Sequence, residues 1–492
     1  MLIVGCSAFA YNLCSSIYFL KLDIHLLVQT LYQTVAAQAK MIEGLQALNK
    51  AQATMIVTLN QQVAALQTAL TILKNKKDSS NSHTPPSKDE NRVKKNQSLR
   101  KPTGLKIGGQ PGHEGKTLEC RSVVDEVVKH SPDFCNSCGN DLTATAETFV
   151  VSRQVLDIPP IVLQCTEHQV YKKICSCGHV MQGSFPPYAN AAIQYGPNTG
   201  ALVGYLHTRQ YLPYQRMKEF LHDVMKLPIS TGGINNILQR LTSKAQPAYK
   251  QIWQRIQQAT VVGADETSMN INGKLNWIWA WQNDTLTYLV ASANRGFKTI
   301  EATFANGLPN AVLNHDRYAA HFKMQVSQHQ ICTAHLLRDF NYLDQLYQLK
   351  CSWAKDFKQL LSDAVLLKKQ LSVADYYQPN TGRDELFNRL NNLLHYTINA
   401  DCKKGISLQK KLLPQQDSIL YFLLQPNVPP DNNGSERAIR NVKVKQKISG
   451  QYKSMDGANI FVILRSVIDT AIKSGQNALN AFYTIAALGG SE

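Results

Sequence analysis

Apolar positions near the N-terminus recur with the spacing of a long amphipathic helix. Residues 24–75 contain almost no glycine or proline. The later apolar positions follow one another at steps of three and four residues: Ile56, Leu59, Val63, Leu66, Leu70 and Leu73. This spacing predicts a coiled-coil seam. A helix packed on its own domain is the alternative, but the segment is terminal and leads into a polar linker, so we favour self-association.

The first residues, 1–23, are apolar and begin "MLIVGCSAFAYNLCSSIYFL". A secretory signal peptide carries positive charge before its apolar stretch, and none is present here. The length would suffice for a membrane span, but Gly5, Ser7 and Asn12 weaken that interpretation. We interpret these residues as an apolar extension of unassigned role and expect no membrane partner.

A polar, basic segment follows at residues 76–117. Between Lys74 and Lys106 there are ten Lys/Arg and three Asp/Glu, interspersed with Ser, Asn and Pro. Such a composition cannot bury a core, so we expect a flexible linker. It serves either as a solvated tether or as a contact for phosphate backbone, and these two roles are compatible. The turn-rich "GGQPGHEGKT" closes it.

Two close cysteine pairs stand in residues 118–187, where short strands are expected. Cys135 and Cys138 have C-x2-C spacing, and Cys175 and Cys177 have C-x-C spacing; a glycine follows each pair. Four such thiolates can hold a tetrahedral zinc ion, which predicts a zinc-ribbon-like module with a structural Zn²⁺. The alternatives are ligation by His168 or His179, and reduced cysteines without metal.

Helical periodicity returns at residues 198–256. "YQRMKEFLHDVMKLPISTGGINNILQRL" predicts helix, turn, helix, with Ser230 or Thr231 capping the second helix. A DNA-binding helix-turn-helix is one interpretation. A plain helical hairpin is at least as good, because the second helix offers only Arg240 and Lys244 as obvious basic contacts.

The pattern changes to strands from residue 257. "ATVVGADETS", "KLNWIWAWQ" and "LTYLVASA" predict three strands, "GFKTIEATFA" a helix, "NAVLNHD" a fourth strand, and "HQICTAHLLRDFNYL" a fifth strand running into a helix. Three antiparallel strands followed by parallel ones is the order of a ribonuclease-H-like core. We therefore expect a multidomain chain whose α/β core spans residues 257–475, with a helical insertion at about 340–425 and a C-terminal tail at 476–492.

Three acids are placed for chemistry in such a core. Asp265 and Asp316 end the first and fourth strands, which are neighbours in that sheet, and Glu436 stands near the start of a later helix. Convergent carboxylates repel one another unless cations lie between them. Two Mg²⁺ (or Mn²⁺) ions about 3.5–4 Å apart would satisfy them. A turn or surface position is the alternative for any single acid, but the set of three favours catalysis.

Neighbouring residues receive lesser roles. Glu266 should point to the opposite face from Asp265 and is not expected as a primary ligand. Trp277, Trp279 and Trp281 alternate along one strand face, which is typical of a core. Cys332 and His335 form a C-x2-H pair that could orient the site, bind zinc, or only pack.

Basic residues follow Glu436 along its helix. They are expected to hold DNA phosphates, with a solvated basic face as the alternative for the lysines; they are Arg437, Arg440, Lys443, Lys445 and Lys447. The net charge of the chain, +17 with pI near 9.3, also suggests a polyanionic partner, nucleic acid before anionic membrane. Eleven cysteines in 492 residues do not resemble a secreted disulfide framework.

Several separated motifs resemble the transposases of the insertion sequence 66 family. They are "DSSNSHTPPSKD", "GGQPGHEGKT", the cysteine pairs, "ADETS", "NHDRYAAHF", "CTAHLLRDF" and "NNGSERAIRNVKVKQKISG". The resemblance runs in family order from about Leu45 to the C-terminus. It departs at the C-x-C pair, where a wider spacing is expected, and in the first twenty residues.

The resemblance implies a bacterial DDE transposase with an N-terminal coiled coil, a zinc-binding domain and a ribonuclease-H-like catalytic domain. Its triad would be Asp265, Asp316 and Glu436. The expected function is metal-dependent strand cleavage and transfer at element ends, in a DNA-associated cytoplasmic protein that forms homo-oligomers and works with accessory proteins of the element. The alternatives are a DNA-binding regulatory protein with an inactive core, and a nuclease that only cleaves.

Overall fold

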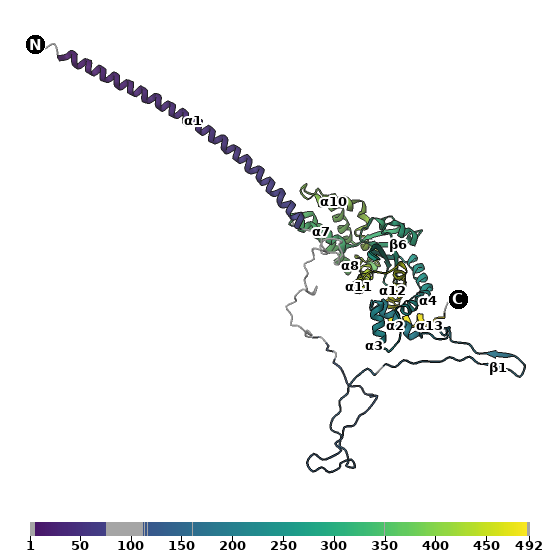
Figure 1. The fold of residues 1–492 in the computed structure, drawn as a ribbon. Coiled ribbons are helices and arrows are strands. Elements are labelled where there is room, and N and C mark those ends of the chain that lie inside the picture. Colours follow the sequence, from purple (N-terminus) through teal and green to yellow (C-terminus); the bar gives the residue numbers. More distant parts are fainter. Residues whose placement is uncertain are drawn as a thin grey trace.

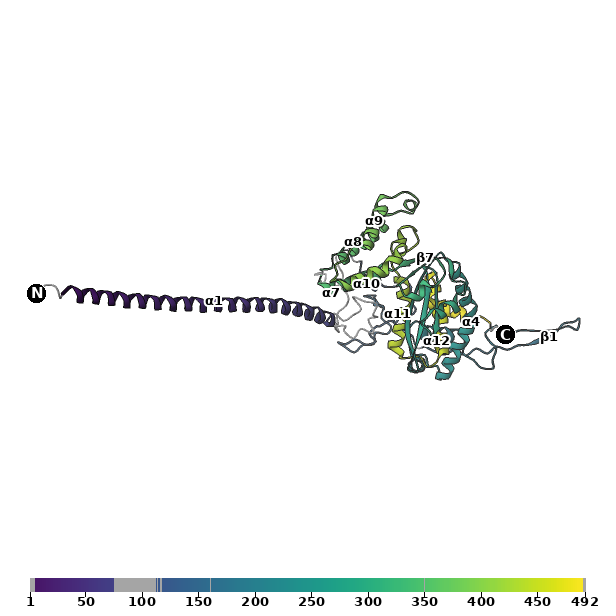
Figure 2. The same ribbon diagram turned by 90° about the horizontal axis from the view of Figure 1, so that it is seen from above.

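The computed structural model describes residues 5–74, 112, 114–115, 117–159, 161–348 and 350–489, without the side chains of residues 5–23, 25 and 71–74. Most of the predicted basic linker therefore lies outside the described residues. The segment before it is a single helix, α1 (Gly5–Lys74), which projects away from the rest of the chain in Figures 1 and 2. Leu59, Val63 and Leu70 on the predicted seam are exposed. Within the described residues, no helix combines the length and the apolar character that crossing a membrane requires.

Little regular structure forms between residues 117 and 195. The two short strands here, β1 (Lys172–Ile174) and β2 (Val180–Gln182), pair antiparallel, and an isolated bridge joins Phe134 and Asp141. Gly139 and Gly178, which follow the cysteine pairs, both have left-handed φ values, 76° and 86°. The tight turns expected after each pair are therefore present.

The core is built on a five-stranded mixed sheet. Its strands are β3 (Val261–Ile271), β4 (Lys274–Gln282), β5 (Thr287–Ser292), β6 (Leu308–His315) and β7 (Val326–Ile331). The spatial order is β5-β4-β3-β6-β7, with β3, β4 and β5 antiparallel and β3, β6 and β7 parallel. The predicted strand directions are confirmed, and β3 and β6 are neighbours as expected.

The β3–β4 hairpin closes through a two-residue turn. Asn272 and Gly273 both have positive φ, 47° and 77°, and Ile271 pairs with Lys274. Asn-Gly is the sequence that such a turn favours, because both positions require left-handed backbone. β3 continues six residues beyond Asp265 to reach this turn, so the acid lies inside the strand. The prediction that Asp265 ends the first strand is wrong, because the strand extends to Ile271 as one arm of the hairpin. Its parallel pairing with β6 does end nearby, at Gly263 and Asn314.

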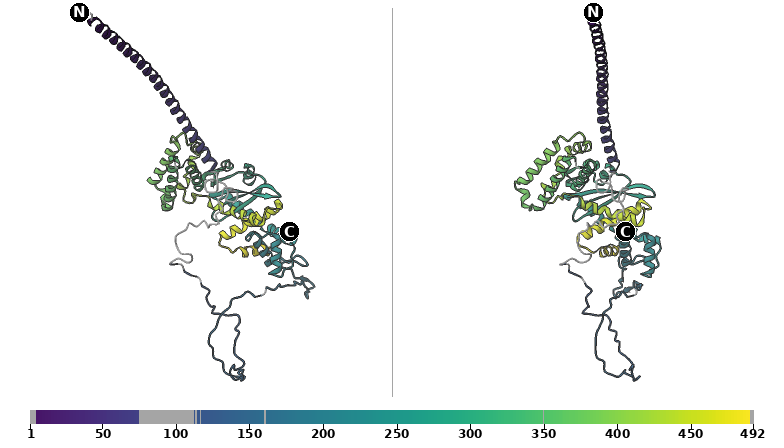
Figure 3. Two further views of the ribbon diagram at one scale, coloured as in Figure 1. Left: turned by 60° about the vertical axis from the view of Figure 1, so that its left-hand side comes forward. Right: turned by 90° about the vertical axis from the view of Figure 1, so that its left-hand side faces the viewer.

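One face of the sheet packs on helices that precede and follow it in the sequence. They are α2 (Pro197–Thr208), α3 (Tyr214–Asp223), α4 (Thr231–Gln257), α11 (Asn433–Ser449), α12 (Met455–Lys473) and α13 (Ala478–Ala487). Figure 3 shows the C-terminal helices in yellow along the sheet. These helices share one hydrophobic core with Met269, Ile278 and Leu289 of the sheet. The helical region 198–256 is therefore part of the same packed body.

The α3–α4 pair matches the predicted helix, turn, helix. The hydroxyl of Ser230 accepts a hydrogen bond from the N–H of Gly233 at 2.9 Å, as an N-cap does. The predicted apolar stripe of α4 is buried in the shared core: Ile234, Ile237, Leu238 and Leu241.

Residues 476–492, predicted as a tail, contain α13, which packs against α2. Phe482 is fully buried, and Gly204 of α2 makes room for its ring. The prediction of a tail is wrong for this helix. "ALNAFYTIAA" is too short and too uniformly apolar for its periodicity to identify a packed element.

On the other face of the sheet, Ile252 and Ile256 at the end of α4 share a core with two short helices. The short helices α5 (Phe297–Thr303) and α6 (Ala319–Phe322) cover Trp279 and Trp281, which stack with ring centroids 5.8 Å apart. The expectation that these tryptophans belong to a core is confirmed for both.

Beyond β7, α7 (Thr333–Tyr347) leads into α8 (Ser352–Gln370), α9 (Thr381–His395) and α10 (Lys403–Leu412), with 3-10 turns at Ala374–Tyr377, Leu413–Ser418 and Tyr421–Leu423. These helices form their own core where the insertion was expected, and α8 and α9 stand to one side of the sheet in Figure 2.

Candidate functional site

Asp265 lies within β3 on the sheet face that α11 covers. Its side chain is buried, and Oδ1 accepts the N–H of Glu266 at 2.8 Å. Burial raises the pKa of Asp265 well above its usual range, and the charges of Asp316, Glu266 and Glu436 raise it further. The structure therefore brings the three predicted acids near enough to repel one another.

Asp316 immediately follows β6, whose residue Asn314 pairs with Gly263 of β3. The next residue, Arg317, has a left-handed φ of 71°, and the chain turns so that the N–H of Tyr318 donates to Asp316 Oδ1 at 2.9 Å. Left-handed backbone is uncommon for a residue with a Cβ, so this turn stores strain. Asp316 is half-buried at the edge of the site.

Glu436 stands in the first turn of α11 and faces α7. Its Oε1 lies 3.3 Å from Nη2 of Arg338 and 3.6 Å from Nε2 of His335. The His335 of the predicted C-x2-H pair thus contacts a predicted catalytic acid. Cys332 is fully buried, where its sulfur accepts the N–H of Asn432 at 3.2 Å, and burial raises its pKa to about 11. These contacts favour an orienting role for the pair.

The start of α11 is hydrogen-bonded to β3 beside Asp265. The side-chain amide of Asn432 donates to the backbone oxygen of Ala264 at 2.7 Å. This approach needs the glycine at position 263, since a Cβ there would lie 2.5 Å from Asn432 Oδ1. The same loop borders an open cavity of ≈ 1110 Å³, which Asn314, Gly434 and Arg437 also line.

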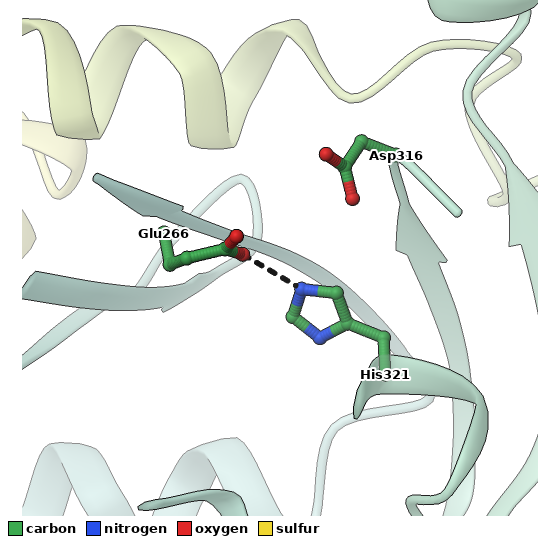
Figure 4. Close-up of side chains that lie close together, drawn as sticks. All are labelled: Glu266, Asp316 and His321. Carbon is green, nitrogen blue, oxygen red and sulfur yellow. Dashed lines mark hydrogen bonds and ion pairs between the residues drawn. The ribbon is translucent and has the colours of Figure 1, made fainter. Parts of the chain in front are cut away.

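The tightest set of potential ligand atoms is not the predicted triad. In the described part of the chain, one group of at least three His, Cys, Asp or Glu side chains has its ligand atoms all within 4.8 Å of one another. It consists of Glu266, Asp316 and His321 (Figure 4). Asp316 therefore has the other two predicted acids on one side, and Glu266 and His321 on the other.

Glu266 points to the opposite face from Asp265, as predicted, and is almost fully buried there. Its Oε1 accepts two hydrogen bonds from Arg295, at 2.8 and 3.0 Å, and Oε2 lies 3.2 Å from Nε2 of His321. Burial would raise the pKa of Glu266, but His321 and Arg295 outweigh it and lower the pKa below its usual value. Sequence reasoning missed Arg295 and His321, although "NHDRYAAHF" carries the histidine close to Asp316.

The residue types at the predicted triad fit a hard divalent cation. Carboxylate oxygens are the ligands that Mg²⁺ prefers, and a buried carboxyl with two like charges nearby is the environment that a cation would relieve. Asp265, Asp316 and Glu436 come from β3, the end of β6 and α11, so three elements supply the donors.

The basic residues of α11 are either exposed to solvent or packed against the protein. Arg437, Arg440 and Lys447 are exposed, as a DNA contact requires. Lys443 donates to the backbone oxygen of Ser268 at 2.6 Å. Lys445 was predicted to contact DNA, with a solvated face as the alternative, and it fits neither: it is buried, and its ammonium lies over the rings of Tyr452 and Phe461. We therefore leave Lys445 out of the residues available to DNA.

The predicted zinc ligands form two local pairs. Hydrogen bonding from Ser137 and Cys138 lowers the pKa of Cys135, and hydrogen bonding from Cys177 and Ser176 lowers that of Cys175. A lowered pKa favours the thiolate that binds metal. In the described part of the chain, the two pairs do not combine into one four-sulfur group.

Comparison with known protein families matches two parts of the chain. The model described as "Transposase IS66 family" matches residues 192–460, and the model described as "zinc-finger binding domain of transposase IS66" matches residues 132–178. The first match includes Asp265, Asp316 and Glu436, and the second includes both cysteine pairs. A search of the curated proteins found no match. The chain belongs to the IS66 family of transposases, and it carries the zinc-finger domain of that family.

Proposed function

We propose that this protein is a DDE transposase that binds element ends and catalyses metal-dependent strand cleavage and strand transfer. The observation that carries the proposal is the approach of Asp316 and Glu436 to buried Asp265, whose pKa is raised by burial and further by these charges. The order and directions of the five strands support a ribonuclease-H-like core. The family match makes the transposase the first reaction class to consider.

Asp265, Asp316 and Glu436 would hold two Mg²⁺ or Mn²⁺ ions. When bound, such ions activate the attacking oxygen and stabilise the leaving oxygen of an in-line displacement. Asn432 holds α11 against β3, and Arg338 and His335 orient Glu436. Water would attack first to nick the DNA, and the freed 3′-hydroxyl would then attack the target. Neither step needs a serine or tyrosine nucleophile on the protein.

DNA phosphates would contact the exposed basic side of α11 beside the acids. Arg437 and Arg440 are both exposed there, and Arg437 also lines the cavity at the start of the helix. Guanidinium groups can bind phosphate oxygens through paired N–H donors. The high net charge would add attraction that is independent of sequence.

The zinc-finger domain would hold one structural Zn²⁺ through Cys135, Cys138, Cys175 and Cys177. Because metal binding can supply the folding free energy of a small domain, zinc would order the largely irregular described chain between residues 117 and 195. The ordered domain would then contact DNA. The exposed apolar face of α1 would pair with a second copy and bring two DNA ends together in the cytoplasm.

The test compares wild type with Asp265→Asn on labelled DNA carrying the ends of the element. The substitution keeps the size of the side chain but removes its charge. We expect binding affinity to stay within about twofold and Mg²⁺- or Mn²⁺-dependent nicking to disappear. Nicking at the wild-type rate would refute the assignment, and binding without nicking in both proteins would favour a DNA-binding protein with an inactive core.

A further inference from the structure

The turn that contains Asp316 is held by a second set of contacts, separate from the three acids. The set consists of Glu266, Arg295, Tyr318 and His321, and we call it the Glu266 network. Its members come from β3, the loop after β5, and the residues that start or form α6. All of them lie on the sheet face opposite to α11.

Arg295 connects Glu266 to the turn. Its guanidinium donates twice to Glu266 Oε1 and lies between two aromatic rings, 4.7 Å from the centroid of Trp277 and 4.3 Å from that of Tyr318. A guanidinium stacked on rings and paired to a carboxylate has little freedom to move. The position of the Tyr318 ring is therefore coupled to Glu266.

Tyr318 in turn fixes Asp316. Its N–H donates to Asp316 Oδ1 at 2.9 Å, and its hydroxyl donates to the backbone oxygen of Arg295 at 3.3 Å. Arg317, between Asp316 and Tyr318, has a left-handed backbone conformation. Because this conformation is strained, the turn needs contacts from other segments to persist. Arg317 itself pairs with Asp339.

His321 closes the network on the other side of Glu266. Its ring is fully buried, and Nε2 faces Glu266 Oε2, as Figure 4 shows. The ring also packs edge-on against Trp279, with centroids 5.6 Å apart. Glu266 is thus paired with both Arg295 and His321. His321 follows Asp316 by five residues, and Arg295 contacts Tyr318 of the same turn.

Direct metal binding by Glu266, Asp316 and His321 is the competing interpretation of the same group. A metal-bound histidine almost always donates its second ring N–H to another acceptor. His321 Nδ1 is buried without a partner in the described chain, and Arg295 already neutralises Glu266. Both observations favour a network that supports Asp316 over one that adds ligands.

We propose that Glu266 is a positioning residue for the strand-cleavage reaction, acting through Arg295, Tyr318 and His321 to fix the carboxylate of Asp316. This inference rests on the proposed function, in which Asp316 holds a divalent cation. Loss of the network would leave the Asp316 carboxylate present but poorly oriented toward the cation. Outer contacts of this kind typically change metal affinity or activity by about 10- to 100-fold.

The experiment compares wild type with Glu266→Gln and Arg295→Ala in the full-length protein. Arg295 is partly exposed, so its replacement disturbs the network with less risk to folding than a change at buried Glu266. Glu301→Gln, at an exposed position of α5, is the matched control. The readouts are kcat and KM for nicking, Mn²⁺ binding by calorimetry without DNA, and the thermal unfolding midpoint.

We expect both network variants to lose about 10- to 100-fold in kcat and to bind Mn²⁺ about 10-fold more weakly, with KM for DNA unchanged. The unfolding midpoint should stay unchanged in Arg295→Ala, which separates a positioning role from a loss of folding. Wild-type kcat and Mn²⁺ affinity in both variants would overturn the inference. Complete loss of Mn²⁺ binding in Glu266→Gln, as in Asp316→Asn, would make Glu266 a ligand and also overturn it. If the wild type does not nick DNA, the proposed function fails, and the Mn²⁺ measurements still decide the role of Glu266.

Discussion

At the scale of the residue, Asp265 and Glu266 show how adjacent carboxyls acquire opposite properties. Successive side chains of a strand point to opposite faces. Asp265 is buried beside two further acids, and its pKa rises; Glu266, although buried, meets His321 and Arg295, and its pKa falls. The alternation was predictable from the sequence. The identity of the groups on each face was not, because it depends on contacts between distant segments.

Lys445 offers a test of residue-scale electrostatics away from the acids. Burial lowers its pKa from 10.5 to about 8. At about 1.4 kcal/mol for each pKa unit, burying the charged form disfavours folding by roughly 3 kcal/mol. This penalty is fully present below pH 8, declines as pH rises from about 8 to 10.5, and is absent above, because the unfolded chain holds the proton longer.

We therefore expect Lys445→Met to be more stable than wild type at pH 7, with the difference shrinking by up to roughly 3 kcal/mol as pH approaches 10.5. Urea unfolding followed by tryptophan fluorescence at several pH values measures it. Lys447→Met, exposed on the same helix, is the control. A difference that does not change with pH would contradict the account.

At the scale of the element, the strands were easier to predict than the last helix. The β-branched run before Asp265 and the alternating tryptophans of β4 carry local signals that identify the strands. The neighbouring positions of β3 and β6 were expected from the sequence of antiparallel and parallel strands in a ribonuclease-H-like core. Helix α13 carries a weak periodic signal, and its place depends on the fit of Phe482 to Gly204. The network behind Asp316 also escaped prediction, since its members are joined only by folding.

The contact between α2 and α13 predicts a specific sensitivity at Gly204. A Cβ there would lie 2.6 Å from the ring of Phe482 and 3.1 Å from Leu241. We expect Gly204→Ala to lower the free energy of unfolding by about 1–3 kcal/mol through overpacking. Gly232→Ala, where the nearest atom is Ser230 Oγ at 3.7 Å, should not destabilise. Equal unfolding midpoints in urea for both variants would contradict this packing.

The zinc-finger domain is a second element-scale case, because its order should depend on metal. We expect one Zn²⁺ per chain in wild type and less than about one tenth of that in Cys138→Ser, since a structural site needs all four thiolates. Metal content by mass spectrometry measures this. Cys120→Ser, at an exposed cysteine outside the pairs, is the control. Full zinc occupancy in Cys138→Ser would show that other ligands hold the ion.

At the scale of the whole molecule, the exposed apolar face of α1 predicts self-association. Leu59, Val63 and Leu70 lie on one seam and are open to solvent in the single chain. Removing residues 1–75 should reduce the molar mass of the assembly to that of one chain, because pairing of α1 would be its main contact. Light scattering on the eluting protein measures this, and an unchanged assembly would place the interface elsewhere.

The central claim is that the three acids carry out both cleavage and joining of DNA. The most direct measurement is strand transfer with labelled DNA carrying the element ends and Mg²⁺ or Mn²⁺, comparing wild type with Glu436→Gln. The account predicts metal-dependent nicked and joined products in wild type and neither in the variant. Joined products formed equally by Glu436→Gln would contradict it, and nicking without joining in wild type would indicate a nuclease.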